Sequence, residues 1–116
     1  MSGYGSGLKG EEAAERCLQA LGMTTVARRY RAADGEIDLI MRDGETLVFV
    51  EVKYRPAGRP GDGLAAVGAA KRRRMTHAAA VFLLEGEYSG GPVRFDVVEI
   101  TGAGALHVPN AFPAQL

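Results

Sequence analysis

Apolar and polar residues alternate with a period of two in two neighbouring stretches of the chain, residues 35–40 and 49–55. Successive side chains of a β-strand point to opposite faces, so this alternation predicts two strands. An Asp43–Gly44 pair between them is typical of a tight turn, which makes the two strands a hairpin. Apolar residues occupy both faces of this hairpin, as expected for a central pair of strands that is covered on both sides.

Four charged side chains of the hairpin share one face. Glu36 and Asp38 lie on the first strand, and Glu51 and Lys53 lie on the second. A two-residue turn at Asp43–Gly44 sets Asp38 diagonal to Glu51, and a different loop brings the two directly opposite each other. In either register we expect the charged side chains to converge.

Clustered carboxylates between apolar neighbours repel one another and lose their hydration, which destabilises the fold unless a cation or raised pKa values relieve the charge. A divalent metal would relieve it, and carboxylate oxygens suit Mg²⁺ or Mn²⁺. The ammonium group of Lys53 could then orient a water molecule or a phosphate. The alternative interpretation is a solvated ladder of cross-strand ion pairs, which is common for alternating charges on a hairpin. The apolar residues on both faces favour the metal site.

A helix over residues 8–21 is predicted by apolar residues at helical spacing, and Gly22 ends it. The same spacing turns Glu11, rather than Glu12 or Glu15, toward the interior, where a carboxylate needs a partner. The apolar stripe of this helix consists of Ala14, Cys17, Leu18 and Leu21.

Three further elements are predicted from the rest of the pattern: a strand over residues 24–31, a second helix over residues 64–84 and a last strand over residues 93–100. A loop rich in Gly, Pro and Arg precedes the second helix at residues 55–63. The order α-β-β-β-α-β, with the second helix as a crossover, predicts an α/β (α+β) fold with a mixed central sheet flanked by helices. The apolar residues of the tail, Leu106, Val108 and Phe112, are expected to dock on the core.

The length of 116 residues and the 47% share of hydrophobic residues predict one domain, residues 1–116, with a single core. A flexible arm is expected at residues 1–7, which lack the basic and apolar regions of a signal peptide. The single cysteine, Cys17, excludes an internal disulfide and suits a reducing compartment, so the protein is expected in the cytoplasm. No apolar run reaches the roughly 18 residues of a membrane span, so no membrane partner is expected.

The net charge of zero argues against a protein that coats nucleic acids without specificity, but the charge is unevenly distributed. Eleven of the 14 Lys and Arg residues lie between Arg28 and Arg74, together with seven acidic residues that include the clustered carboxylates. Metal binding would leave this half of the chain positive, which suits a nucleic-acid partner. Lys71 lies near the packed side of its helix and could reach the hairpin, whereas the run 71–74 could also be a solvated helix face. The candidate phosphate contacts are Lys71, Arg72, Arg31, Arg55 and Arg28.

Specific motifs are spread over nearly the whole chain: Gly10-Glu11-x-x-Ala14, Gly35-Glu36-Ile37-Asp38-Leu39-Ile40, Phe49-Val50-Glu51-Val52-Lys53-Tyr54-Arg55, Lys71, Arg94-Phe95-Asp96-Val97-Val98 and Asn110-Ala111-Phe112. With these motifs the chain resembles the YraN-like bacterial family. That family is part of the PD-(D/E)xK nuclease superfamily, which includes restriction endonucleases and Holliday-junction resolvases. One position departs from the family pattern, because Arg29 stands where an Asn is common before the hairpin.

The resemblance implies a role for the three clustered acidic residues of the hairpin, for Lys53 and for one acidic residue on the first helix. Asp38 and Glu51 would be metal ligands, and Lys53 would be the catalytic lysine. Glu11 would be a helix-borne carboxylate that assists the metal. Glu36, which occupies the place of the superfamily's proline, would support the ligands without binding the metal itself.

These features together predict a metal-dependent endonuclease that hydrolyses phosphodiester bonds of DNA, including branched or junction DNA, with Mg²⁺ or Mn²⁺ as cofactor. Cutting both strands with so small a protein would favour a homodimer. The alternative is a non-catalytic module that retains the nuclease fold and binds nucleic acid or assembles with other molecules. Metal-dependent cleavage of DNA of varied structure distinguishes the two hypotheses.

Overall fold

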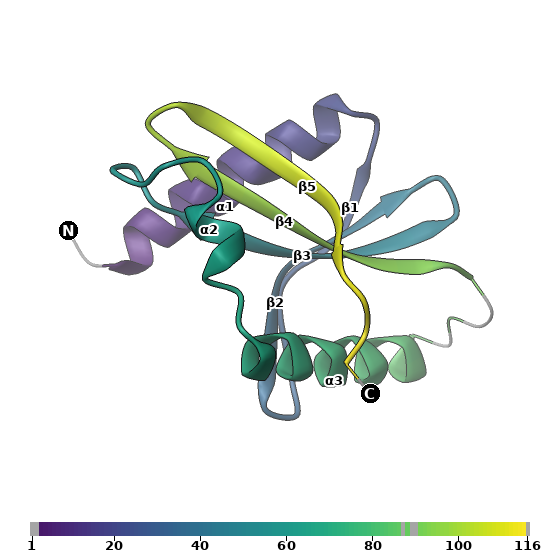
Figure 1. The fold of residues 1–116 in the computed structure, drawn as a ribbon. Coiled ribbons are helices and arrows are strands. Elements are labelled where there is room, and N and C mark those ends of the chain that lie inside the picture. The colour runs from purple at the N-terminus through teal and green to yellow at the C-terminus, as the bar shows by residue number, and fades with distance from the viewer. Residues whose placement is uncertain (1–2, 87, 89–90, 116) are drawn as a thin grey trace.

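The computed structural model describes residues 3–86, 88 and 91–115. The backbone forms one five-stranded sheet with helices on both faces (Figure 1). No helix in this described part of the chain is long and apolar enough to cross a membrane. The elements in chain order are α1 (Gly3–Ala20), β1 (Thr24–Ala32), β2 (Gly35–Asp43), β3 (Thr46–Tyr54), α2 (Asp62–Ala65), α3 (Ala69–Glu85), β4 (Val93–Thr101) and β5 (Gly104–Phe112).

The five strands lie side by side in the order in which they occur in the sequence. Strands β1, β2 and β3 form an antiparallel meander, and β4 and β5 form a second antiparallel pair. Strands β3 and β4 are parallel, because α2 and α3 carry the chain back along the sheet between them. The predicted mixed sheet and the order α-β-β-β-α-β are therefore confirmed, and they are compatible with a restriction-endonuclease-like core.

Each face of the sheet has its own hydrophobic core, one under α1 and one under α3 (Figure 1). Side chains of β3 alternate between the two cores, so Val50 packs on the α1 side and Phe49 packs on the α3 side. In β2, however, Ile37 and Ile40 both join the core on the α3 side. The period of two is therefore interrupted around Asp38, which lies between them.

Helix α1 starts earlier than the sequence predicts. Its backbone is helical from Gly3, whereas an arm was expected at residues 1–7 and a helix from residue 8. Residues 1–2 of the predicted arm lie outside the described part of the chain. Once the packed part of a helix has formed, each added residue closes a hydrogen bond without a new nucleation step, so even a Gly-rich segment can extend it.

The apolar stripe of α1 is confirmed at Ala14 and Leu18, which are fully buried. The prediction for Leu21 is wrong, since this side chain is 60% exposed. Leu21 lies past the end of the helix, where the chain turns at Gly22 with a φ of 96°. Met23, the first residue after this turn, fills the core instead.

The second predicted helix, residues 64–84, is divided into α2 and α3. Glu99 on β4 explains the division, because its carboxylate accepts hydrogen bonds from the backbone N–H groups of Gly61 and Leu64 and so anchors α2 to the sheet. The chain then passes through Gly68 in an extended conformation before α3 begins. A contact with a distant strand thus overrides a continuous helical pattern.

The tail forms a strand, β5, that the sequence analysis did not predict. Phe112 docks on the core as expected and stacks on Phe95, with ring centroids 5.1 Å apart, whereas Leu106 is 40% exposed. Pro109 interrupts the alternation of this segment, and an irregularity in the pairing with β4 accommodates it. Pairing with β4, rather than a pattern of its own, therefore makes this segment a strand.

Candidate functional site

The β2–β3 hairpin brings Asp38 and Glu51 together. The turn consists of Gly44 and Glu45, one position later than the expected Asp43–Gly44 turn, and the last paired residues of the ladder adjoin Asp38 and Glu51. The strands part at this point, and the N–H of Val52 donates a hydrogen bond to Asp38 Oδ2 at 2.7 Å. The two carboxyl groups therefore lie against each other where the sheet opens.

The pKa of Asp38 is raised to about 8, mainly by burial. The negative charge of Glu51 and a hydrogen bond between the two carboxyl groups raise it as well, and the charge of Glu11 contributes least. The hydrogen bond from Val52 acts in the opposite direction. At neutral pH Asp38 is therefore mostly protonated.

Glu51 is only 3% exposed and faces two lysines. The Nζ of Lys53 lies 3.1 Å from Glu51 Oε2, and the Nζ of Lys71 lies 3.6 Å from Oε1, in agreement with the predicted reach of Lys71. The carboxyl group of Glu51 thus has two ammonium groups on one side and Asp38 on the other. Among the described residues, Glu51 Oε1 is a buried oxygen without a hydrogen-bond partner. Such an oxygen is unfavourable for folding and is an open position for a cation or a donor.

A buried acid that the sequence analysis did not single out lies beside Lys53. Glu99 is opposite Lys53 in the parallel pairing of β3 and β4 and is fully buried. Gly63 of α2 packs so closely that a Cβ atom there would lie 2.9 Å from the Cβ atoms of both residues. Helix α2 thus holds the base of Lys53 in place. The sequence did contain one signal for Glu99: this acid lies on the same face of its strand as Phe95 and Val97, which are core residues.

Helix α1 presents two glutamates toward the sheet, so the prediction that Glu11 points inward holds, whereas the prediction that Glu15 does not is wrong. Glu15 is 8% exposed and is bound by Arg28, at 3.0 Å from Nε and 2.6 Å from Nη2, and by the hydroxyl of Thr25. The hydrogen bond from Arg28 lowers the pKa of Glu15. Strand β1 covers this flank of the helix, which helical spacing alone does not reveal. Glu11 is bound instead by Arg29, at 2.7 Å from Nε.

Arg29 occupies a left-handed backbone conformation, with a φ of 52°. Asn adopts this conformation more readily than Arg does, so the Asn that the resemblance leads one to expect here would suit the backbone. In this chain the guanidinium group holds the carboxylate of Glu11. Glu11 is thus engaged with Arg29 and reaches Asp38 through its charge only.

Glu36 does not join the carboxylate pair, so the expected convergence of four charged side chains is wrong for this residue. It lies opposite Arg31 on β1, 3.7 Å from the Nε of that arginine, and its side chain is 36% exposed. The interrupted alternation of β2 separates Glu36 from Asp38. The cluster contains two carboxylates rather than three.

The remaining predicted phosphate contacts fall into two groups. Arg28 is bound to α1, and Arg72 donates from Nε to a backbone carbonyl before α3 and lies 5.0 Å from the ring centre of Phe112. These two arginines connect parts of the fold. Arg31 and Arg55 are exposed and can meet a ligand from solvent.

Among the described residues, no three His, Cys, Asp or Glu side chains gather into a ready metal site. Asp38 and Glu51 offer carboxylate oxygens at one place, and a cation would replace the proton of Asp38 and engage Oε1 of Glu51, which has no hydrogen bond. This donor set fits a hard divalent cation that keeps several water ligands, such as Mg²⁺. Glu11 would contribute only after release from Arg29.

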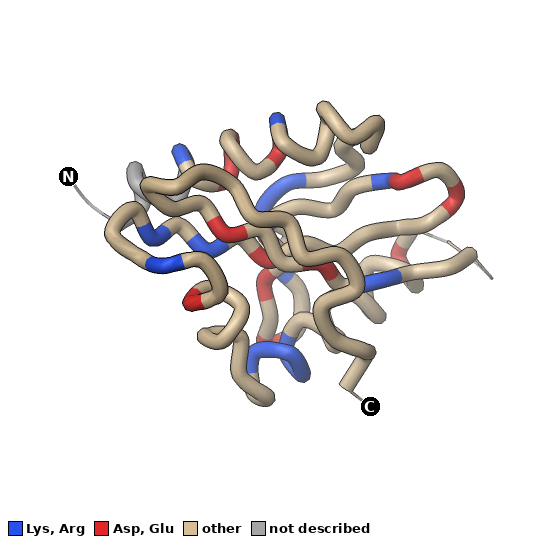
Figure 2. The backbone as a smooth tube through the Cα atoms, turned by 45° about the horizontal axis from the view of Figure 1, so that its top comes forward, with Lys and Arg blue, Asp and Glu red and all other residues tan. Residues whose placement is uncertain are grey.

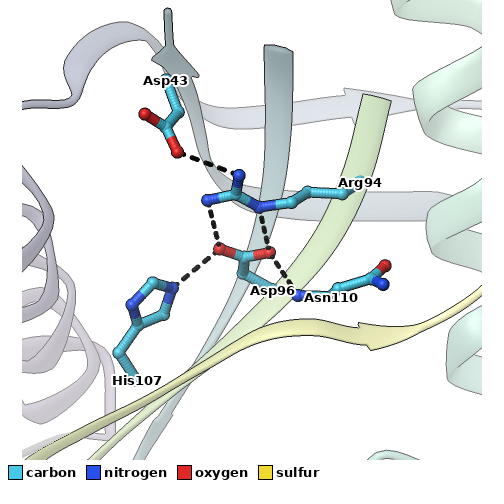
Figure 3. Close-up of polar contacts among 5 residues, drawn as sticks. All are labelled: Asp43, Arg94, Asp96, His107 and Asn110. Atoms are coloured by element: carbon cyan, nitrogen blue, oxygen red, sulfur yellow. Dashed lines mark hydrogen bonds and ion pairs between the residues drawn. The ribbon is translucent and has the colours of Figure 1, made fainter. Parts of the chain in front are cut away.

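Strand β4 carries another fully buried carboxylate, Asp96, which the motifs included without a role. Figure 3 shows its partners: Nε and Nη2 of Arg94 at 3.0 and 3.3 Å, Nε2 of His107 at 2.7 Å and the backbone N–H of Asn110 at 2.9 Å. Arg94 also reaches Asp43 at the end of β2, at 2.9 Å. Both oxygens of Asp96 are engaged, so this cluster joins β2, β4 and β5.

Comparison with known proteins identifies relatives along most of the chain. The model of the uncharacterised protein family UPF0102 matches residues 10–100. The UPF0102 protein of Photorhabdus laumondii is 40% identical over 114 residues, which cover 97% of this chain and 90% of the relative. The UPF0102 protein of Beutenbergia cavernae is 46% identical over 109 residues, which cover 90% of each. The chain therefore belongs to the UPF0102 family, in agreement with its resemblance to the YraN-like proteins.

Proposed function

We propose that this protein is a metal-dependent endonuclease of the PD-(D/E)xK superfamily that hydrolyses phosphodiester bonds of DNA. The observation that carries the proposal is the pair of adjacent carboxyl groups, in which Asp38 has a raised pKa and Glu51 has a buried oxygen without a hydrogen bond. Such a pair is unfavourable for folding by itself and becomes favourable when it binds a cation. Perturbed carboxylates of this kind occur frequently at functional sites.

Asp38 and Glu51 would hold a Mg²⁺ or Mn²⁺ ion, which supplies Lewis-acid activation of a phosphate and of a water molecule when bound. Lys53, whose Nζ lies 3.1 Å from Glu51, would donate to a phosphate oxygen and stabilise the charge that develops in the transition state. Lys71 would keep the other side of Glu51 neutralised and oriented.

Basic segments on both sides of the pair support nucleic acid as the substrate. Figure 2 shows acidic positions on the central strands between one basic stretch at the start of α3 and another in the segment that follows β3. Phosphates of a bound strand would be attracted to these stretches; Arg55 belongs to the second of them, and both Arg55 and Arg31 are exposed. For substrates that require a cut in each strand, the proposal includes a homodimer.

The direct test is cleavage of a panel of single-stranded, flapped, forked and four-way-junction DNA with Mg²⁺ or Mn²⁺. The wild type should cut at least one of these, and Asp38→Asn and Glu51→Gln should abolish cleavage because each removes a proposed metal ligand. Lys53→Ala should lower the rate by roughly 10²-fold, with part of the rate retained by Lys53→Arg. An inactive wild type would argue against the enzyme, and so would equal cleavage by Asp38→Asn, which would reveal a contaminating nuclease.

A non-catalytic DNA-binding module is the second candidate, and a specific observation favours it. Lys53 and Lys71 both lie within ion-pair distance of Glu51, so the negative charge of this carboxylate is compensated without a metal as long as Asp38 keeps its proton. Such a module would bind DNA equally well in EDTA and in Mg²⁺ and would leave every substrate of the panel uncut.

A further inference from the structure

A hollow of about 400 Å³ lies between the turn that joins β1 to β2 and the first turns of α3. It adjoins the carboxylate pair, because Lys71 lines the hollow and also lies 3.6 Å from Glu51. The charged side chains of one wall are Arg31 of β1, Asp34 of the β1–β2 turn and Glu36 of β2. Those of the other wall are Lys71 and Arg74 of α3.

Close packing fixes the two walls relative to each other. Gly35, at the start of β2, lies so near the carbonyl oxygen of Arg74 that a Cβ atom would overlap it. On the same side, Nδ1 of His77 on α3 lies 3.5 Å from the carboxylate of Asp34 in the turn. The hollow is therefore shaped by the backbone and not only by the conformations of long side chains.

The charges of the hollow favour an anion. Three cationic groups, Arg31, Lys71 and Arg74, line it against two carboxylates, Asp34 and Glu36, which leaves an excess of one positive charge. Both Arg31 and Arg74 are exposed, so their guanidinium groups can meet a ligand from solvent. A guanidinium group binds a phosphate through two parallel hydrogen bonds, which suits an extended, charged backbone.

We propose that this hollow binds a backbone phosphate of the nucleic-acid strand, next to the phosphate held at Asp38 and Glu51. The inference rests on the proposed function for the identity of the ligand. Lys71 lies between the two positions and contacts the strand as it passes from the carboxylate pair toward the β1–β2 turn. Arg31 and Arg74 position that strand, whereas Arg72 remains bound to the fold.

Binding of a short single-stranded oligothymidylate in the absence of metal, measured over a range of salt concentrations, tests the hollow. Arg74→Ala and Arg31→Ala should each weaken binding about fivefold at low salt, and the slope of log affinity against log salt should become shallower by up to about 0.7 for a lost phosphate contact. Arg73→Ala is the matched control, since Arg73 is exposed on the same helix but does not line the hollow. It should change the affinity and the slope much less.

Two further variants move the affinity in opposite directions. Glu36→Gln should strengthen binding about twofold, because it removes a repelling charge and releases Arg31. Gly35→Ala should weaken binding, because its methyl group pushes α3 away from the turn and separates the walls. Melting curves of each variant show whether the fold is retained, and the Glu36→Gln result is a gain that misfolding cannot mimic.

The inference is overturned if Arg31→Ala and Arg74→Ala bind as tightly as the wild type, if Arg73→Ala weakens binding equally, or if the wild type does not bind the oligonucleotide. These results are distinguishable from failure of the proposed function. A protein that binds through the hollow but cuts no DNA with metal keeps the hollow and loses the endonuclease. Metal-dependent cleavage together with unchanged binding in the hollow variants would support the endonuclease and overturn the inference about the hollow.

Discussion

Two buried carboxylates on adjacent strands, Glu51 on β3 and Asp96 on β4, have opposite surroundings. Both oxygens of Asp96 are engaged by Arg94, His107 and the backbone of Asn110. Glu51 keeps one oxygen without a hydrogen bond and lies against a second carboxyl group. A fully paired buried acid stabilises the fold, whereas an incompletely paired one marks a place where a ligand can contribute what the fold does not.

The difference arises from how the neighbouring strand behaves. The pairing of β5 with β4 is irregular beside Asp96, and Asn110 of β5, at a φ of 51°, directs its N–H to the carboxylate. At Glu51 the neighbouring strand β2 parts from β3 and contributes Asp38, an acid, where a donor would be favourable. Irregular strand pairing therefore produces a structural cluster in one place and an open site in the other.

Replacement of an aspartate by asparagine should change stability in opposite directions in the two clusters, at Asp96 and at Asp38. The larger change is expected for Asp96→Asn. It should lower the free energy of unfolding by about 3 kcal/mol at neutral pH, because Arg94 loses its buried anionic partner while it stays half-buried. Urea unfolding measures the change, with Glu12→Gln on the exposed side of α1 as the control. A loss no greater than that of the control would remove the structural role of the Asp96 cluster.

Asp38→Asn should instead stabilise the protein, by roughly 2 kcal/mol at pH 8. The folded-state pKa of Asp38, about 8, lies above its ordinary value of 3.8, so the folded protein holds an extra proton between these values and the wild type loses stability as pH rises through them. Asn has no proton to lose and can still accept the hydrogen bond from Val52. The advantage of the variant should therefore grow from pH 4 to pH 8 in urea unfolding. Parallel stability profiles of the two proteins would contradict the raised pKa.

Metal binding should distinguish the Asp38–Glu51 pair from the Asp96 cluster through a smaller change in stability. Mg²⁺ or Mn²⁺ at about ten times its Kd should stabilise the wild type by about 1.4 kcal/mol, seen as a higher Tm. The effect should be weaker at pH 6 than at pH 8, because the proton on Asp38 competes with the metal. The double variant Asp38→Asn, Glu51→Gln should show no shift. Asp96→Asn should retain it, and an equal shift in all three proteins would place the metal elsewhere.

Lys53→Met should have the smallest effect, a loss of about 1 kcal/mol at pH 8. The variant keeps the packing of the aliphatic stem against α2 but removes the ammonium group 3.1 Å from Glu51, which leaves only the more distant Lys71. Thermal or urea unfolding measures the loss. Unchanged stability would show that Glu51 does not depend on Lys53 for its charge.

The sequence by itself determined the helices and strands in which apolar residues recur at a regular spacing and therefore lie on one face. Alternation in residues 35–40 and 49–55 was sufficient for the hairpin, and helical spacing was sufficient for most of α1 and α3. Where the period stays regular, as in β3, side-chain direction follows from local backbone geometry and can be read without knowledge of distant contacts, whereas the interruption around Asp38 in β2 could not be read in this way. Asp38 and Glu51 could nevertheless be placed near each other before the structure was known.

Only the tertiary structure decided which charged groups have partners. It buried Glu15 beneath β1 in preference to Glu11, placed Glu99 under α2, and separated Glu36 from the pair. It also made a strand of the tail by pairing it with β4. Burial and pairing depend on segments that are distant in the sequence, and the free energy of a charge depends on all of them together. The local pattern therefore predicted where the carboxylates lie. The assembled sheet decided that Asp96 has a full set of hydrogen-bond partners and that Glu51 keeps an oxygen without one.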